Sequence, residues 1–141
     1  MIQLKFEDRV KVWKDLRDEL ETHPRPFHRI IEFCNKLPIG SKKVNPYDPA
    51  TQTLPWHLLD ESSFCEYEIA QLCAYTLQLT DRFSEANVEI HISKDIENNK
   101  EMYLVCLDRS IVLGYRSEVL TLDELPDNVV SQKIYHMPPL Q

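Results

Sequence analysis

The residues of this sequence that could carry out chemistry are few, and the clearest group places a carboxylate next to an imidazole. Glu89 and His91 are two positions apart in an alternating segment, so on a strand both side chains point to the same side. Asp108 follows the next predicted strand and is expected nearby. Two carboxylates and an imidazole could bind a divalent metal or transfer protons, as in a metal-dependent hydrolase or nuclease. The alternative is that these residues form the solvent-facing side of an amphipathic strand.

The four cysteines, Cys34, Cys65, Cys73 and Cys106, do not indicate a metal site or a catalytic nucleophile. None belongs to a CxxC pair, and three fall on predicted apolar faces, where a thiol is inert. Free buried thiols in a reducing compartment are the simplest interpretation, because the spacing supports neither a disulfide nor a zinc site. The sequence also lacks Walker A, GxGxxG and GxSxG motifs. We therefore expect no cofactor and favour a protein that is not an enzyme.

Length and charge set further limits on the class of protein. A chain of 141 residues suggests one domain, and 43% hydrophobic residues can bury a core. The net charge is −7, and the bases of the N-terminal segment alternate with acids, so a nucleic-acid partner is not expected. No apolar run approaches the roughly 20 residues that cross a bilayer, and no signal peptide is recognisable. We expect a soluble cytoplasmic protein that makes no membrane contact.

The chain is organised around residues 62–83, the longest apolar-rich stretch without glycine or proline. Its apolar residues follow the 3.6-residue rhythm of a helix and cover most of the circumference, which indicates a helix buried on several sides. Ser63 and Glu66 form a candidate capping box at its start. Two further helices and a helical turn are predicted over about 6–22, 26–36 and 56–59.

After Phe83 the hydrophobic period changes from 3.6 to 2, which predicts strands. Polar turns separate these segments, so we expect an antiparallel meander of three to four strands. The strands are predicted over 88–93, 102–107, 111–115 and 119–122, with 129–136 returning to the edge of the sheet. The order of the predicted elements, with helices first and strands later, predicts an α+β domain spanning 1–141. Three to four N-terminal helices (about 6–83) pack on one face of the C-terminal sheet (about 87–136), followed by a short tail at 137–141.

A segment without regular periodicity, Pro38–Pro55, holds four of the nine prolines and precedes the central helix. Long irregular segments in small domains are often functional, and aromatic side chains on a proline-stiffened loop make good contacts for a partner. We therefore expect a protein partner to bind the loop over 42–57. For Trp56 the alternative is a core position at the end of the helical layer. The candidate binding residues are Lys42, Lys43, Tyr47, Trp56 and His57.

Three short runs in the middle of the chain are Asn45–Pro49 (NPYDP), Pro55–Trp56 and Tyr75–Leu79 (YTLQL). With these runs, the region over about 44–115 resembles a family of small uncharacterised proteins encoded by tailed bacteriophages, including marine phages. The resemblance implies a protein made in the cytoplasm of an infected bacterium, either as a virion component or as a factor that acts on the host. It implies no catalytic residue.

The leading hypothesis is a non-enzymatic, phage-encoded accessory or assembly factor that binds another protein through the loop 42–57. The first alternative is the metal-dependent hydrolase or nuclease that uses Glu89, His91 and Asp108. The second alternative is a protein that binds a small metabolite, which requires a concave pocket with a few polar groups. The sequence leaves open whether copies of the chain associate.

Overall fold

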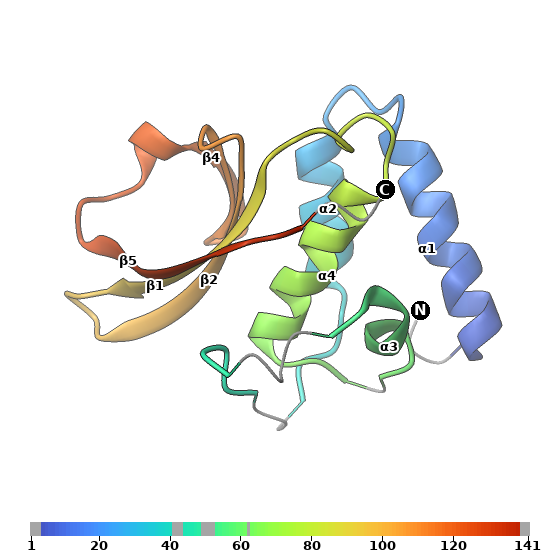
Figure 1. The fold of residues 1–141 in the computed structure, drawn as a ribbon, viewed down its shortest axis with the longest axis horizontal. Coiled ribbons are helices and arrows are strands. Elements are labelled where there is room, and N and C mark those ends of the chain that lie inside the picture. Colours follow the sequence, from blue (N-terminus) through green and yellow to red (C-terminus); the bar gives the residue numbers. More distant parts are fainter. Residues whose placement is uncertain (1–3, 41–43, 49–52, 62, 139–141) are drawn as a thin grey trace.

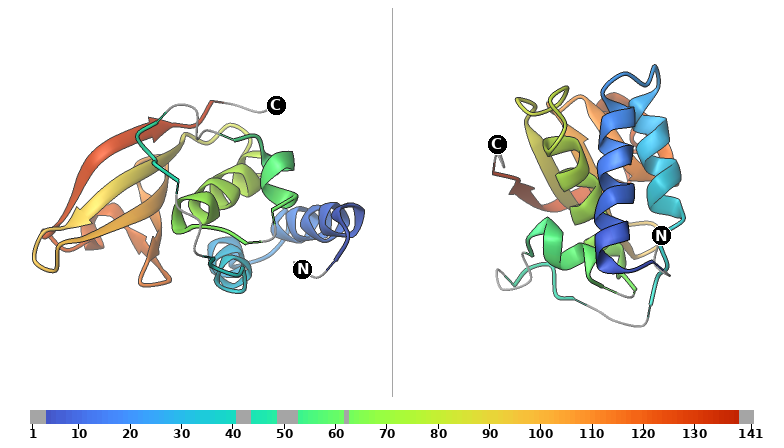
Figure 2. Two further views of the ribbon diagram at one scale, coloured as in Figure 1. Left: turned by 90° about the horizontal axis from the view of Figure 1, so that it is seen from below. Right: turned by 90° about the vertical axis from the view of Figure 1, so that its right-hand side faces the viewer.

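A computed structural model describes residues 4–40, 44–48, 53–61 and 63–138, in which four helices are followed by a five-stranded sheet (Figure 1). The helices lie together on one side of the sheet, as two further views confirm (Figure 2). This is the α+β arrangement that the sequence predicts, with one strand more than the meander alone. No helix in the described part of the chain combines the length and apolar character needed to span a membrane.

The first two helices begin and end where the sequence signals require. α1 (Phe6–Leu20) buries Trp13, Leu16 and Leu20, whose spacing of three and four residues places them on one face. α2 (Pro26–Asn35) begins with a proline, which is favourable there because the first helical N–H needs no partner in the helix. Both helices are therefore local consequences of the sequence pattern.

The central helix is shorter than predicted. α4 runs over Glu66–Gln78 rather than 62–83, and its N-cap is Cys65. The predicted capping box of Ser63 with Glu66 is wrong by two residues, because the Glu68 carboxylate accepts the hydrogen bond from the backbone N–H of Cys65 at 3.2 Å. A capping box with a cysteine at the N-cap does not match the Ser/Thr pattern by which such boxes are recognised in a sequence.

α4 is buried on all sides, including the strip that looks polar in the sequence. The hydroxyl of Tyr75 donates a hydrogen bond to the backbone carbonyl of Thr53, and Gln78 Nε2 donates to the carbonyls of Met137 and Pro138 at 3.3 and 2.9 Å. The loop before α3 (Pro55–Leu59) and the C-terminal segment therefore cover this strip. Its buried members are Glu68, Gln71, Tyr75 and Gln78.

The sheet is antiparallel, with the strand order β4-β3-β2-β1-β5. The last strand returns to pair with β1 at the edge, as the sequence predicts, and the register shifts there between Ile92 and Ser93. A second register shift lies between Leu113 and Tyr115 of β3 against β4. The strands are β1 (Val88–Asp95), β2 (Lys100–Leu107), β3 (Ile111–Tyr115), β4 (Glu118–Thr121) and β5 (Val129–His136).

Both faces of the sheet carry buried apolar side chains. The inner face packs on the helices through residues such as Ile90 and Val105. The outer face has a small cluster of its own, formed by Leu104, Cys106 and Val112. In Figure 1 the chain between β4 and β5 lies on this outer side, away from the helices. Polar residues of the outer face are therefore not automatically exposed to solvent, contrary to what alternation alone suggests.

Candidate functional site

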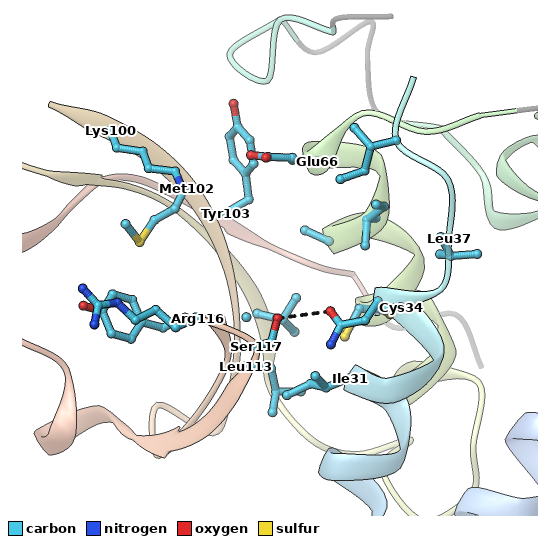
Figure 3. Close-up of a pocket in the computed structure, with 18 of the residues that line it drawn as sticks. Ile31, Cys34, Leu37, Glu66, Lys100, Met102, Tyr103, Leu113, Arg116 and Ser117 are labelled. Carbon is cyan, nitrogen blue, oxygen red and sulfur yellow. Dashed lines mark hydrogen bonds between the residues drawn. The ribbon is translucent and has the colours of Figure 1, made fainter. Parts of the chain in front are cut away.

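A cavity of about 580 Å³ lies between the helical layer and the sheet. Its walls come from α2, α4 and the strands β2 and β3, as the close-up in Figure 3 shows. A volume between about 300 and 1,000 Å³ is typical of pockets for small organic ligands. The apolar part of the lining includes Ile31, Leu37, Ile69, Ala70, Val105 and Leu113.

A few polar side chains interrupt this apolar lining. Glu66 at the start of α4 lies beside Tyr103 of β2 in Figure 3, and Lys100 and Arg116 add two cationic groups. Burial raises the pKa of Tyr103 to about 12, with further contributions from nearby carboxylates, so its hydroxyl keeps its proton. A neutral hydroxyl can donate one hydrogen bond and accept others, so the cavity offers both apolar contact and directed polar contacts.

The turn between β3 and β4 lies at the edge of this cavity, and the guanidinium of Arg116 lies over the ring of Tyr115, 5.4 Å from its centroid. Arg116 and Ser117 have φ of 50° and 58°, the left-handed region that residues other than glycine adopt rarely. Ser117 Oγ donates a hydrogen bond of 3.2 Å to Asn35 Oδ1 at the end of α2, which ties the turn to the helical layer (Figure 3). Backbone conformations of this kind are often retained at binding sites because the surrounding structure holds them.

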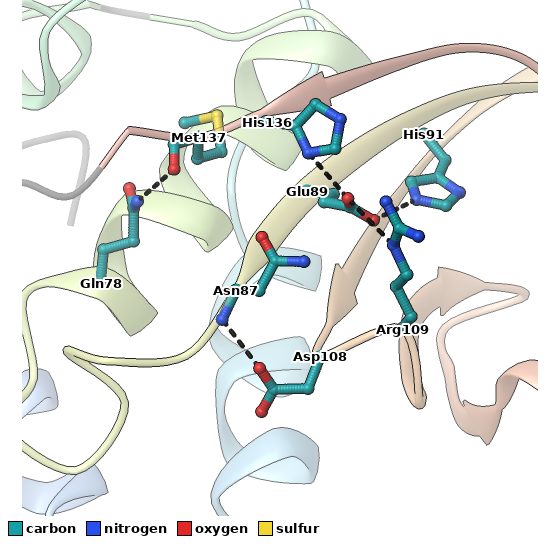
Figure 4. Close-up of polar contacts among 8 residues, drawn as sticks. All are labelled: Gln78, Asn87, Glu89, His91, Asp108, Arg109, His136 and Met137. Atoms are coloured by element: carbon teal, nitrogen blue, oxygen red, sulfur yellow. Dashed lines mark hydrogen bonds and ion pairs between the residues drawn. The ribbon is translucent and has the colours of Figure 1, made fainter.

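A second polar cluster lies on the outer face of the sheet, around the carboxylate of Glu89. Glu89 has no exposed surface, and its Oε1 lies 3.0 Å from His91 Nε2 (Figure 4). His136 Nδ1 on the neighbouring strand is 2.8 Å from Oε2, and Arg109 Nε is 3.5 Å from the same oxygen. Burial alone would raise the pKa of Glu89, but the His91 hydrogen bond and the charges of Arg109 and His136 lower it below its usual value.

The structure brings Glu89 and His91 together, as predicted, but it does not add Asp108 to them. The Asp108 carboxylate instead accepts a hydrogen bond of 2.8 Å from the backbone N–H of Asn87, and Figure 4 shows it turned away from Glu89. Asp108 therefore fixes the turn after β2, and the neighbouring Arg109 reaches the Glu89 carboxylate in its place. Among the described residues, no group of three or more His, Cys, Asp or Glu side chains has the arrangement of a metal site.

The predicted binding residues of the loop are not all in one place. Lys42 and Lys43 lie outside the described residues. Tyr47 is 43% exposed and lies beside Glu101 of β2. Burial raises the pKa of Tyr47, and the charge of Glu101 raises it further. Trp56 is 46% exposed, and its ring packs edge-on against the buried ring of Trp13 at 5.5 Å. Trp56 thus rests on the core with one side of its ring, and the other side is exposed.

The neighbour of Trp56, His57, is exposed on the same short helix, α3. It adds a titratable group to the surface around Trp56. The loop before α3 is held to the body by Tyr135, whose hydroxyl donates to the Pro46 carbonyl at 2.5 Å. The part of the loop that the structure describes is therefore packed on the domain, as its apolar residues predict.

Cys65 stands at a position that would activate a thiol in another setting. The N-terminus of a helix lowers the pKa of a cysteine. Here burial raises the pKa of Cys65, and the adjacent Glu68 carboxylate raises it further. Burial and the Glu68 carboxylate therefore keep this thiol protonated near neutral pH.

Sequence reasoning missed the cavity, because its lining is assembled from two helices and from strands of the C-terminal sheet, which are far apart in the chain. No motif marks it. One local signal for the turn at its edge is the pair Arg116-Ser117 between two alternating segments. A connection of two residues is long enough only for a tight hairpin turn.

The fold and the cavity together define an α+β protein with a space of small-molecule size between its layers. The architecture is similar to that of calcium-bound LapG from Legionella pneumophila, with a TM-score of 0.68 over 91% of this chain and 74% of that one. The sequences are 14% identical, so the similarity concerns the fold alone. No protein-family model matches the chain, and the search of curated proteins found no match.

Proposed function

We propose that this protein binds a small amphipathic organic molecule in the cavity between α2, α4 and the sheet. The observation that carries the proposal is the cavity itself, with about 580 Å³ and an apolar lining interrupted by a few polar groups. An apolar body would replace water on the lining, and Tyr103 and Lys100 would orient a polar end. Of the three functions that the sequence suggests, the geometry favours this one.

The first test measures binding of the fluorescent probe anilinonaphthalene sulfonate, which has an aromatic body and an anionic end. We expect wild-type protein to bind it and to melt at a higher temperature in its presence, because a ligand of the folded state stabilises that state. Ile69→Trp fills part of the cavity and should weaken binding about tenfold or more, or by about 1.4 kcal/mol. The matched control is Ile134→Trp at an exposed position of β5.

The control should bind the probe as wild type does. Near-UV circular dichroism establishes that each variant keeps its packed core, since partly unfolded proteins also bind this probe. Equal binding by the Ile69 variant and the control would contradict the proposal, as would the absence of any thermal shift in wild type.

A second function is binding of a protein partner, which the loop suggests. We propose that the partner contacts the adjacent side chains of Leu54 and Trp56, which are 56% and 46% exposed. The contact of Trp56 with Trp13 supports this proposal, because an aromatic ring already held in place loses little conformational entropy on binding. The partner would present an apolar side chain to this surface.

To test this, a photo-crosslinking residue is placed at position 56, and at the exposed position 122 as a control. A partner joined at position 56 is identified, purified and titrated against wild type, Trp56→Ala and Tyr47→Ala. A central aromatic contact should cost about 2 kcal/mol or more when it is removed. Equal affinity for Trp56→Ala with an unchanged melting temperature would reject the role of Trp56, and equal crosslinking at both positions would reject the surface.

The enzymatic alternative has less support, because Asp108 does not face Glu89 and His91. Its test is the melting temperature with magnesium, manganese, zinc or calcium, the last included because LapG is described as calcium-bound. A rise that Glu89→Gln abolishes would revive a metal site at this cluster. Cleavage of nucleic acid by wild type, lost in the same variant, would make the protein a nuclease.

The cytoplasmic location and the phage origin belong to the same proposal. Four free cysteines, three of them buried, support a reducing compartment. Detection of the protein by mass spectrometry in infected cells, and in purified virions, distinguishes a factor that acts in the host from a virion component.

A further inference from the structure

The first half of β2 has a strand neighbour on one side only. β1 pairs with the whole of β2, Lys100–Leu107, whereas β3 pairs only with Val105–Leu107. Residues 100–104 therefore form an open edge on the side of β3 in the described sheet. Exposure follows the same division, because the first four residues of β2 are exposed or half-buried and the last four are buried.

The backbone groups that point to this edge belong to Glu101 and Tyr103. The N–H of Asp108, just after β2, donates to the carbonyl of Asn87 on the β1 side at 2.8 Å. Alternate residues of a strand direct their N–H and C=O groups to the same neighbour, so the even-numbered residues of β2 face β1 and the odd-numbered ones face β3. In agreement, a Cβ placed on Gly114 of β3 would lie 3.4 Å from the carbonyl oxygen of Tyr103.

The open edge forms part of the cavity wall. Met102 and Tyr103 both line the cavity, although neighbouring residues of a strand direct their side chains to opposite faces of the sheet. Figure 3 shows these two side chains leaving β2 in different directions. One cavity can contact both of them only by passing around the edge of the strand. The cavity therefore presents backbone hydrogen-bonding groups beside its apolar lining.

We propose that the ligand of the cavity is a short free peptide in an extended conformation. Its backbone pairs with Glu101 and Tyr103 as an added strand, and one apolar side chain enters the cavity among Ile31, Ile69 and Leu113. This inference rests on the proposed function, because it names the class of molecule that the cavity binds. In such complexes the backbone hydrogen bonds give affinity, and the adjoining pocket selects the side chain. A strand advances by about 3.4 Å per residue, so the edge over 100–104 matches a peptide of about five residues.

The charged groups of the cavity favour a peptide with free ends. Glu66 and Lys100 line the cavity, and neither forms an ion pair with another residue in the described part of the chain. The other two charged lining residues are engaged, since Asp95 accepts a hydrogen bond from an amide and Arg116 lies over an aromatic ring. One carboxylate and one ammonium group thus remain to complement the terminal ammonium and carboxylate of a free peptide.

The test titrates the pentapeptide Ala-Val-Leu-Val-Ala and two N-methylated analogues into wild-type protein by isothermal titration calorimetry. One analogue is methylated at the central leucine, and the other at both valines. Because alternate N–H groups of a strand point to opposite edges, one analogue should lose affinity tenfold or more and the other should bind much as the parent peptide does. Acetylation and amidation of the ends should weaken binding by about two- to fivefold.

Protein variants test the edge itself. Glu101→Pro removes an N–H that points away from β1, a position where a strand tolerates proline, and should weaken peptide binding tenfold or more. Glu101→Ala keeps this N–H and should bind the peptide at least fivefold more tightly than the proline variant. The matched control is Ile134→Pro on β5, whose N–H also points away from β1 but at the far edge of the sheet. The control should bind the peptide as wild type does, and all three variants should bind anilinonaphthalene sulfonate.

Amide hydrogen exchange in wild type provides a measurement that does not depend on any variant. Exchange at Glu101 and Tyr103 should be fast in the free protein and at least tenfold slower with the peptide bound. Met102, whose N–H faces β1, should stay protected in both states. Near-UV circular dichroism establishes that each variant is folded.

Equal affinity of the two methylated analogues would overturn the proposal, as would equal affinity of the two Glu101 variants or slow exchange at Tyr103 in the free protein. Equal affinity for free and end-capped peptide would reject a free peptide and assign the edge to an internal segment of a larger protein. Binding of anilinonaphthalene sulfonate without binding of the peptide would reject this inference and leave the proposed function standing. Binding of neither would reject both.

Discussion

Thr76→Val should remove a central hydrogen bond of the helical layer while leaving the shape of the side chain almost unchanged. Trp13 of α1 and Thr76 of α4 are both fully buried, and the indole N–H of Trp13 donates to Thr76 Oγ1 at 2.8 Å. Valine has nearly the volume of threonine but cannot accept a hydrogen bond. The variant therefore leaves a buried indole N–H without a partner, which costs about 1–3 kcal/mol.

Other effects of this substitution are small. Thr76 Oγ1 also donates to the Leu72 carbonyl at 2.6 Å, but that carbonyl keeps its backbone hydrogen bond within the helix. A change of about 1 kcal/mol in the free energy of unfolding moves the melting temperature of a domain of this size by about 2–4 °C. Urea unfolding followed by circular dichroism measures the free energy directly. The exposed control Thr22→Val should stay within about 0.5 kcal/mol of wild type.

A double-mutant cycle with Trp13→Phe isolates the hydrogen bond. Phenylalanine removes the N–H, so Thr76→Val should cost less than about 0.5 kcal/mol in that background, although Trp13→Phe itself is destabilising. The reasoning is refuted if Thr76→Val costs the same in both backgrounds. It is also refuted if the single variant is as stable as wild type, since the indole would then have another acceptor.

Three further predictions follow from polar groups and close contacts elsewhere. Glu89→Gln should lower stability near neutral pH by about 1.5–3 kcal/mol, the range for hydrogen bonds to charged groups. The folded state lowers the pKa of Glu89 below 4.5. The stabilisation by its carboxylate is therefore present above that pH and is lost as the pH falls through the folded pKa. Denaturation at several pH values should show that the stabilities of the two proteins converge in acid. Asp95 accepts hydrogen bonds from Asn98 and Asn128, which lower its pKa from 3.8 to about 2. At pH values above about 4, Asp95→Asn should therefore melt at a lower temperature than wild type. The two melting temperatures should approach each other near pH 2. Gly40→Ala places a methyl group 2.3 Å from Ser63 Oγ. It should lower the free energy of unfolding, measured in urea, by about 1–3 kcal/mol. Adding Ser63→Gly to the same chain should restore most of this stability.

Most of the fold could be predicted from the sequence because its signals are local. The 3.6-residue rhythm around Trp13 and the alternation around Ile90 each extend over enough residues to identify a helix and a strand. The limits of α4 could not be predicted, because its apolar residues continue past Gln78 into a turn. Its polar strip also gives no sign that other segments of the chain cover it.

The candidate site was much less accessible to sequence reasoning. Glu89 and His91 share a face through the two-residue period of a strand, so their contact could be predicted. The burial of Glu89 could not, because it depends on His136 of β5 and Arg109 of a turn, which the sheet brings to the same carboxylate. Asp108 was misplaced because a residue with φ of 51° does not continue the alternation of the strand before it.

The cavity has a physical origin in the irregularities of the sheet. β1 and β2 pack on α4 through buried residues such as Val88 and Leu107, close to where their strands begin or end. Further along, the pairing shifts between Ile92 and Ser93 and again around Gly114, whose φ is +105°. Such bulges bend a strand and increase its twist.

The sheet therefore curves, and the strand ends beyond the bulges separate from the helices. The cavity is lined by these ends, including Lys100 and Gly114, and the turn of Arg116 and Ser117 reaches back to α2 across it. Bulge positions depend on strand pairing rather than on composition, so the feature that favours ligand binding is the one that an alternating pattern cannot reveal.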